Sequence, residues 1–96
     1  MKETRIMSTI FLATPLRQYN ANRPQIRLDL RSVAELIPAL EKACPGIGAR
    51  LCDQTGAIKR SVNVFLNNEN VRDLKTDEIV LSERDEIHII PAMAGG

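Results

Sequence analysis

Residues 32–43 read SVAELIPALEKA, and this stretch decides the fold because it predicts a helix between segments with a strand pattern. Ser32 lies three residues before Glu35, which is the spacing of a capping box at a helix N-terminus. Pro38 removes one helical hydrogen bond, so we expect either a kink or an irregular first turn. The sequence Cys44-Pro45-Gly46 predicts the end of the helix. Apolar residues recur at helical intervals along one face: Val33, Leu36, Ile37 and Leu40.

The segments before this helix predict a β-hairpin. Residues 8–12 and 25–30 both alternate in the way typical of a strand with one buried face. Residues 13–24 contain prolines and asparagines, which predict a long turn. The side chains expected on the buried face are Ser8, Ile10, Leu12, Ile26, Leu28 and Leu30.

The segments after the helix predict further strands. A connector with little pattern, which contains Gly48 and Gly56, precedes alternation over residues 61–66. Residues 67–70 predict a polar turn, and Val71 is expected to begin a short strand. Residues 85–90 predict the last strand, and pairing is expected to fade at Pro91, which cannot donate to a sheet ladder. The side chains expected inside are Val62, Val64, Leu66, Ile87 and Ile89.

The order of these elements predicts the fold class. A chain of 96 residues can bury one hydrophobic core but cannot build a second lobe around a deep cleft. A hairpin, a helix and further strands predict an α+β fold, in which one main helix packs on one face of a mixed sheet. We expect a domain over residues 8–91, an N-terminal extension over residues 1–7, and a flexible tail over residues 92–96.

The composition argues against several classes of function. Thirteen basic and twelve acidic residues give a formal net charge of +1, and no stretch concentrates Lys and Arg, so nucleic acid is not an expected partner. No apolar run is long enough to cross a bilayer, and charged residues interrupt any signal-peptide core near the N-terminus. We therefore expect a cytoplasmic protein with no membrane partner.

The residues that most often perform catalysis are sparse. Cys44 and Cys52 have no accompanying Cys/His pair, so we expect reduced structural thiols and no metal site, with a redox or sulfur-relay role as the alternative. His88 is the single histidine, and the alternation of its strand points it away from the core. No glycine-rich phosphate loop or nucleophile elbow is present. The sequence predicts that the protein is not itself an enzyme.

The unusual feature is the end of the chain, PAMAGG over residues 91–96, which follows a strand and carries no charged side chain. Two glycines make a thin segment that can thread a narrow channel with the carboxylate of Gly96 leading. The alternative interpretation is an ordinary frayed terminus.

The strand alternation also predicts a docking patch on the sheet face opposite the helix, formed by Phe11, Phe65, His88 and Ile90. The alternative is that a loop of the same chain covers Phe11 or Phe65. A charged rim could come from isolated arginines: Arg60, Arg72 and Arg84.

The sequence resembles the ubiquitin-like sulfur carriers, a β-grasp family that includes the small subunit of molybdopterin synthase, the thiamine-biosynthesis sulfur carrier and the carrier for cysteine synthesis. The resemblance spans residues 8–96 and rests on RSVNVFLNNENVR, residues 60–72, and on IIPAMAGG, residues 89–96. It is closest to the cysteine-synthesis carrier of actinobacteria. The sequence departs from the family in having six residues before Met7.

The resemblance implies that Gly96, next to Gly95, is the reactive residue. In this family a ubiquitin-activating-type adenylyltransferase and sulfurtransferase uses ATP and Mg to adenylate the terminal carboxylate and to convert it to a thiocarboxylate. A synthase then accepts the sulfur, here for cysteine, and the carrier binds no cofactor of its own. The segment expected to enter the partners is Pro91-Ala92-Met93-Ala94. Three alternatives stay open: a molybdopterin-synthase small subunit, a ubiquitin-like protein modifier, and a non-covalent β-grasp interaction module.

Overall fold

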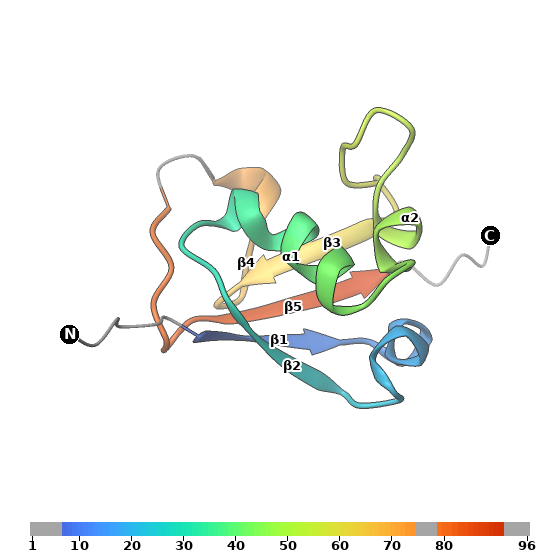
Figure 1. The fold of residues 1–96 in the computed structure, drawn as a ribbon. Coiled ribbons are helices and arrows are strands. Elements are labelled where there is room, and N and C mark those ends of the chain that lie inside the picture. Colours follow the sequence, from blue (N-terminus) through green and yellow to red (C-terminus); the bar gives the residue numbers. More distant parts are fainter. Residues whose placement is uncertain (1–6, 75–78, 92–96) are drawn as a thin grey trace.

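The computed structural model describes residues 7–74 and 79–91, which form a mixed sheet with helices (Figure 1). The sheet has five strands in the order β2-β1-β5-β3-β4, and α1 crosses one of its faces (Figure 1). This arrangement confirms the predicted α+β fold. The strands are β1 (Met7–Leu12), β2 (Gln25–Asp29), β3 (Val62–Leu66), β4 (Glu69–Asn70) and β5 (Glu86–Pro91). The helical elements are η1 (Thr14–Asn20), η2 (Val33–Glu35), α1 (Leu36–Ala43), α2 (Ile47–Leu51) and η3 (Val71–Asp73), where η marks a 3-10 helix.

The central strand of the sheet is β5, and its pairing explains the topology. The strands β1 and β5 pair in parallel, whereas the β1–β2, β3–β5 and β3–β4 pairs are antiparallel. A parallel pair needs a crossover connection, and the long segment that contains α1 supplies it. Because β1 and β5 are parallel, both end at the same edge of the sheet. The predicted hairpin of the first two strands is confirmed.

The hydrophobic core lies between the sheet and α1, as the alternation predicts. Both β1 and β3 alternate half-buried and buried positions. Each fully buried Leu or Ile contributes about 2 kcal/mol through loss of apolar surface from water, and the low aromatic content of 3% leaves most of the core to such residues. Members of the core from the strands and from the helical segment include Ile10, Leu12, Val62, Val64, Ile87, Ile89, Val33, Leu36 and Leu40.

The start of the helical segment differs from the prediction. Ser32 makes no side-chain capping bond, so the predicted capping box is wrong. The carboxylate Oε1 of Glu35 instead accepts a hydrogen bond from the backbone N of Arg31 at 2.9 Å. The α-helix begins only at Leu36, after a 3-10 turn, and Pro38 lies in its first turn, where a missing N–H costs little. Of the two predicted alternatives, a kink or an irregular first turn, the structure has the irregular first turn.

The connector after the helix contains a second short helix that the sequence analysis missed. Gly46 adopts φ +100°, which turns the chain directly from α1 into α2. The carboxylate of Glu41 in α1 accepts hydrogen bonds from the backbone N of Gly46 at 2.9 Å and of Gly48 at 2.8 Å. Ile47 and Leu51 are buried. The side chain of Glu41 thus satisfies the first free N–H groups of α2.

Glu41 should make stability depend on pH in the acid range. The two backbone N–H donors lower the pKa of this carboxyl below its ordinary value of 4.5. A carboxyl with a lowered pKa in the folded state stabilises the fold above its ordinary pKa, and that contribution is lost as pH falls through the lowered value. We expect Glu41→Gln to flatten the decline of the free energy of unfolding below about pH 4.5, measured by urea unfolding at a series of pH values. An unchanged acid slope would contradict the assignment.

Two other connections and the start of the first strand also correct the sequence prediction. Residues 13–24 are not only a turn, because η1 occupies much of them and buries Leu16. Val71 begins η3 and not a strand, because the side chain of Asn70 caps this turn by accepting a hydrogen bond from the backbone N of Arg72. The first strand begins at Met7, one residue earlier than predicted, so Met7 is not part of an extension.

The last strand also continues one residue further than expected. Pro91 is the final residue of β5 and lies opposite Val62 of β3, so pairing does not fade before it. Strand β1 ends at Leu12, the partner of Ile89. On the β1 side of β5, therefore, no strand residue needs a backbone N–H from residue 91. The proline is tolerated because its missing donor faces no acceptor in the ladder.

Candidate functional site

The sheet face opposite α1 carries a row of rings from three strands. His88 of β5 lies between Phe11 of β1 and Phe65 of β3 in the sheet register. The rings of Phe11 and His88 stack with their centroids 4.5 Å apart and an interplanar angle of 11°. Ile90, two residues along β5, is 46% exposed. We call these four residues the docking face: Phe11, Phe65, His88 and Ile90.

Two shallow hollows open on the docking face, one on either side of His88 and Ile90. The first is bounded by Phe11, Arg17 and Pro24, and the second by Phe65 and Asn68. The rings of Phe11 and Phe65 therefore line open hollows, and no described loop of the chain covers them. The structure thus brings together all four residues predicted for the patch, and their role in docking stays a prediction.

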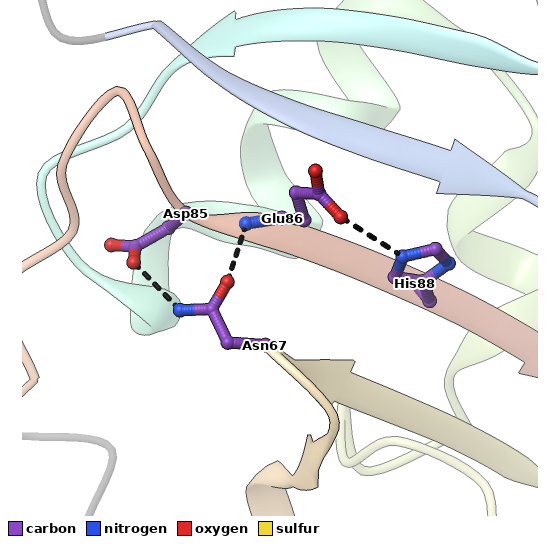
Figure 2. A network of polar contacts seen from close by, with 4 residues as sticks. All are labelled: Asn67, Asp85, Glu86 and His88. Carbon is purple, nitrogen blue, oxygen red and sulfur yellow. Dashed lines mark hydrogen bonds and ion pairs between the residues drawn. The ribbon is translucent and has the colours of Figure 1, made fainter.

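A polar network fixes one end of the docking face (Figure 2). The side chain of Asn67, in the turn after β3, donates to Asp85 Oδ1 at 2.7 Å and accepts from the backbone N of Glu86 at 2.9 Å. Asn67 adopts φ +50°, a conformation that asparagine tolerates well. The carboxylate of Glu86 lies 3.7 Å from His88 Nε2 (Figure 2). The start of β5 is therefore tied to the β3–β4 turn, and the carboxylate of Glu86 lies beside the imidazole of the docking face.

The tail begins where β5 ends, at the same edge as the end of β1. Pro91 is half-buried and is the last described residue. The residues predicted to form the reactive tail lie outside the described residues: Ala92, Met93, Ala94, Gly95 and Gly96. The docking face reaches this edge through Ile90, so a protein docked on this face would contact the residues from which the tail starts.

The side chain of Arg72 makes structural hydrogen bonds that were not predicted from the sequence. Its guanidinium donates to the backbone O of Lys59 at 2.6 Å and of Val62 at 2.7 Å. It also donates to Asn63 Oδ1 at 3.1 Å. Arg72 is therefore not an isolated rim residue as expected. Arg60 and Arg84 are exposed, in agreement with that expectation.

The thiols are placed as structural groups. Cys44 is buried in the core and Cys52 is half-buried. Burial raises the pKa of both thiols, so neither is activated as a thiolate nucleophile. Among residues 7–74 and 79–91, no group of His, Cys, Asp and Glu side chains is placed to hold a metal ion. Within the same part of the chain, no helix is long and apolar enough to span a membrane.

The mixed sheet with its crossing helix defines a ubiquitin-like β-grasp protein. The chain belongs to the ThiS family, which matches its sequence over residues 11–96.

The similar proteins include bacterial and archaeal ones. The sulfur carrier protein CysO of Mycobacterium tuberculosis is 30% identical over an alignment of 90 residues that covers 92% of this chain and 97% of that protein. A chain in the crystal structure of the Amycolatopsis orientalis BexX/CysO complex superposes with a TM-score of 0.80 at 31% identity, covering 93% of this chain and 99% of that one. The small archaeal modifier protein 1 of Methanosarcina acetivorans gives a TM-score of 0.80 at 24% identity over 98% of this chain and 100% of its own, a similarity of fold alone.

Proposed function

We propose that this protein is a sulfur carrier, in which the carboxylate of Gly96 is converted to a thiocarboxylate that supplies sulfur for the synthesis of cysteine. The observation that carries the proposal is the family match through Gly96, together with 30% identity to a CysO sulfur carrier over nearly the whole length of both chains. The carrier acts as a cosubstrate of partner enzymes and is recharged after each transfer.

The proposed chemistry follows from the weak electrophilicity of a carboxylate. The Gly96 carboxylate attacks the α-phosphate of ATP in the active site of a ubiquitin-activating-type enzyme, and pyrophosphate leaves with Mg as its counterion. Sulfide delivered by the partner as HS⁻ then displaces AMP from the acyl carbon and loses its proton, which leaves a thiocarboxylate on Gly96. This anion is a strong nucleophile at neutral pH and displaces a leaving group from the acceptor that a synthase holds, which forms a thioester. Hydrolysis of the acyl–sulfur bond then leaves the sulfur on the acceptor and restores the carboxylate of Gly96.

The division of labour suits the described fold. The two hollows on the docking face are shallow and open, so ATP and the sulfur acceptor would be enclosed by the partners. The docking face would recognise the activating enzyme, while the tail extends from the adjacent edge into its active site. The A. orientalis structure contains a CysO in complex with BexX, which supports a carrier that works in protein complexes.

The proposal is tested by intact-mass spectrometry of the full chain expressed together with its genomic neighbours. We expect a mass increase equal to the replacement of one oxygen by sulfur, located at Gly96 by fragmentation. Isopeptide adducts of the chain on lysines of other proteins would instead identify a protein modifier. Stable co-purification with a large catalytic subunit that makes molybdopterin would identify the small subunit of that synthase, and an unmodified chain in every complex would identify an interaction module.

The docking face gives a further prediction for this function. We expect Phe65→Ala to weaken binding to the activating enzyme by about tenfold or more, because a large aromatic side chain on an exposed face is a frequent hot spot. The loss of folding stability should be only about 1 kcal/mol, since the ring lines an open hollow. Calorimetric titration measures the affinity, and thermal unfolding measures the stability.

A matched control for Phe65→Ala is Leu28→Ala in β2. Leu28 is half-buried and packs against the core, so its truncation should reduce stability and leave the affinity unchanged. If Phe65→Ala lost stability in the same way and kept its affinity, Phe65 would be a core residue and the docking face would be misassigned.

A further inference from the structure

We infer that Arg72 is a positioning residue, which fixes the end of the sheet from which the reactive tail leaves. This inference rests on the proposed function, because it assigns Arg72 a part in presenting Gly96 to the activating enzyme. The starting observation is that the guanidinium of the exposed residue Arg72 makes three hydrogen bonds with the chain around the start of β3 and has no carboxylate partner among the described residues.

The contacts of Arg72 join three segments. Its guanidinium reaches the backbone O of Lys59 and of Val62, and the side chain of Asn63. Its own backbone N donates to Asn70 Oδ1 at 3.0 Å, and Asn70 Nδ2 donates in turn to Asn63 Oδ1 at 3.3 Å. The planar fork of an arginine places two terminal nitrogens against separate acceptors in this way, whereas a lysine has its three donors on a single nitrogen and lacks this fixed geometry. Arg72 thus ties η3 and β4 to the first residues of β3.

The register of the sheet shows why β3 needs this support. Hydrogen-bonded and non-hydrogen-bonded pairs alternate along an antiparallel ladder. The backbone N of Asn67 donates to the backbone O of Glu86 at 2.9 Å, so by alternation the Asn63–Ile90 pair is hydrogen-bonded and the next pair, Val62 with Pro91, is not. The backbone N–H and C=O of Val62 therefore point away from β5.

Among the described residues, no strand covers the outer edge of β3 at Val62. Strand β4 is two residues long and pairs only with Phe65 and Leu66. The backbone N of Val62 donates to Lys59 O at 2.9 Å, and the backbone O of Val62 accepts from Arg72. The residue opposite Pro91 is thus held from its outer side, by Arg72 and by the turn at Lys59, and not by β5.

The position of Pro91 follows from these contacts. Pro91 is the last residue of β5, and β1 no longer pairs at this point because it ends at Leu12, opposite Ile89. Packing against Val62 is therefore the remaining sheet contact for the residue that immediately precedes the tail. Loss of Arg72 should let the start of β3 and Pro91 shift together, while the rings of the docking face, from Phe11, Phe65 and His88, lie further from Pro91 and keep their places.

The test compares Arg72→Ala and Arg72→Lys with the wild-type chain in single-turnover adenylation by the activating enzyme. We expect the adenylation rate at saturating partner to fall about tenfold in both variants, because small misplacements of a reacting group reduce rates strongly. The affinity for the enzyme should stay within about twofold of wild type. The control is Arg31→Ala, since the side chain of Arg31 makes no hydrogen bond or ion pair with any residue in the described ranges, and its rate should be that of wild type.

A second measurement does not depend on the proposed function. Amide hydrogen exchange should be about tenfold faster at Ile90 and Asn63 in both Arg72 variants, with the exchange of Ile10 unchanged. Faster exchange with a normal adenylation rate would reduce Arg72 to a stabilising contact and overturn the inference. Weaker binding with a normal rate would overturn it as well, because Arg72 would then contact the partner directly. If the wild-type chain formed no adenylate, the proposed function would fail, whereas the exchange result would still decide whether Arg72 holds the end of β5.

Discussion

Deletion of Gly96 is expected to lower the rate of adenylation by at least about 100-fold while leaving the fold intact. The shortened chain still ends in a glycine carboxylate, but this carboxylate lies about 3.5 Å, the length of one extended residue, short of the position that the Gly96 carboxylate reaches. Misplacement by as little as about 1 Å can cost about 100-fold when a reacting group must meet its target in line. The position of the carboxylate, more than its chemical nature, should therefore decide the reaction.

Two further variants make this prediction specific. Extension of the chain by one alanine after Gly96 should block adenylation equally, because it displaces the free carboxylate in the opposite direction. Both variants should unfold at the temperature of the wild-type chain, since the buried core residues of the described chain lie between Ile10 and Ile89. Adenylate formation is followed with radioactive ATP and purified activating enzyme. Normal activation of the shortened chain would remove Gly96 from the proposed mechanism.

Much of the fold could be predicted from the sequence because its buried faces are periodic. The alternation of β1 and β3 in the sequence matches their alternating burial in the structure. The helical spacing of Leu36 and Leu40 places both in the core. A long crossover between the first hairpin and the last strand then leaves few ways to bury these faces together.

The elements that were missed are short and are stabilised by individual contacts. The helix α2 has five residues, too few for a visible hydrophobic period. It forms because Glu41 of the preceding helix caps it and because Ile47 and Leu51 pack into the core. The 3-10 helix η1 is fixed in the same way by the burial of Leu16. Such contacts depend on the tertiary structure and leave no pattern in the sequence.

The candidate site likewise contains features that follow from strand periodicity and features that depend on the folded chain. Alternation was sufficient to place Phe11, Phe65 and His88 on one sheet face, and the pairing of their strands brings them side by side. The role of Arg72 could not be predicted, because its acceptors include main-chain carbonyl groups whose positions follow only from the folded chain. A clue is present in the sequence at Asn63, Asn70 and Arg72, but polar residues at such spacings are common in turns.

Gly95→Val is the second substitution with a large expected effect. An adenylating enzyme must enclose the last residues of its carrier so that the carboxylate approaches the α-phosphate of ATP in line. Glycine has no Cβ and adopts backbone angles that other residues avoid. Valine adds a branched side chain that restricts the backbone and widens the segment. We therefore expect adenylation to be slower by about 100-fold in a close-fitting channel.

The measurement is single-turnover adenylation at saturating ATP and enzyme, so that a change in affinity does not contribute to the rate. Gly95→Ala provides the graded comparison, because alanine adds one methyl group and restricts the backbone less than valine. The rate should fall in the order Gly95, Gly95→Ala, Gly95→Val, with the affinity set by the docking face unchanged in all three proteins. If Gly95→Val reacted as fast as the wild-type chain, the segment would not thread a narrow channel. The glycine pair would then be needed for a reason other than its small size, such as recognition of the thiocarboxylate by the synthase.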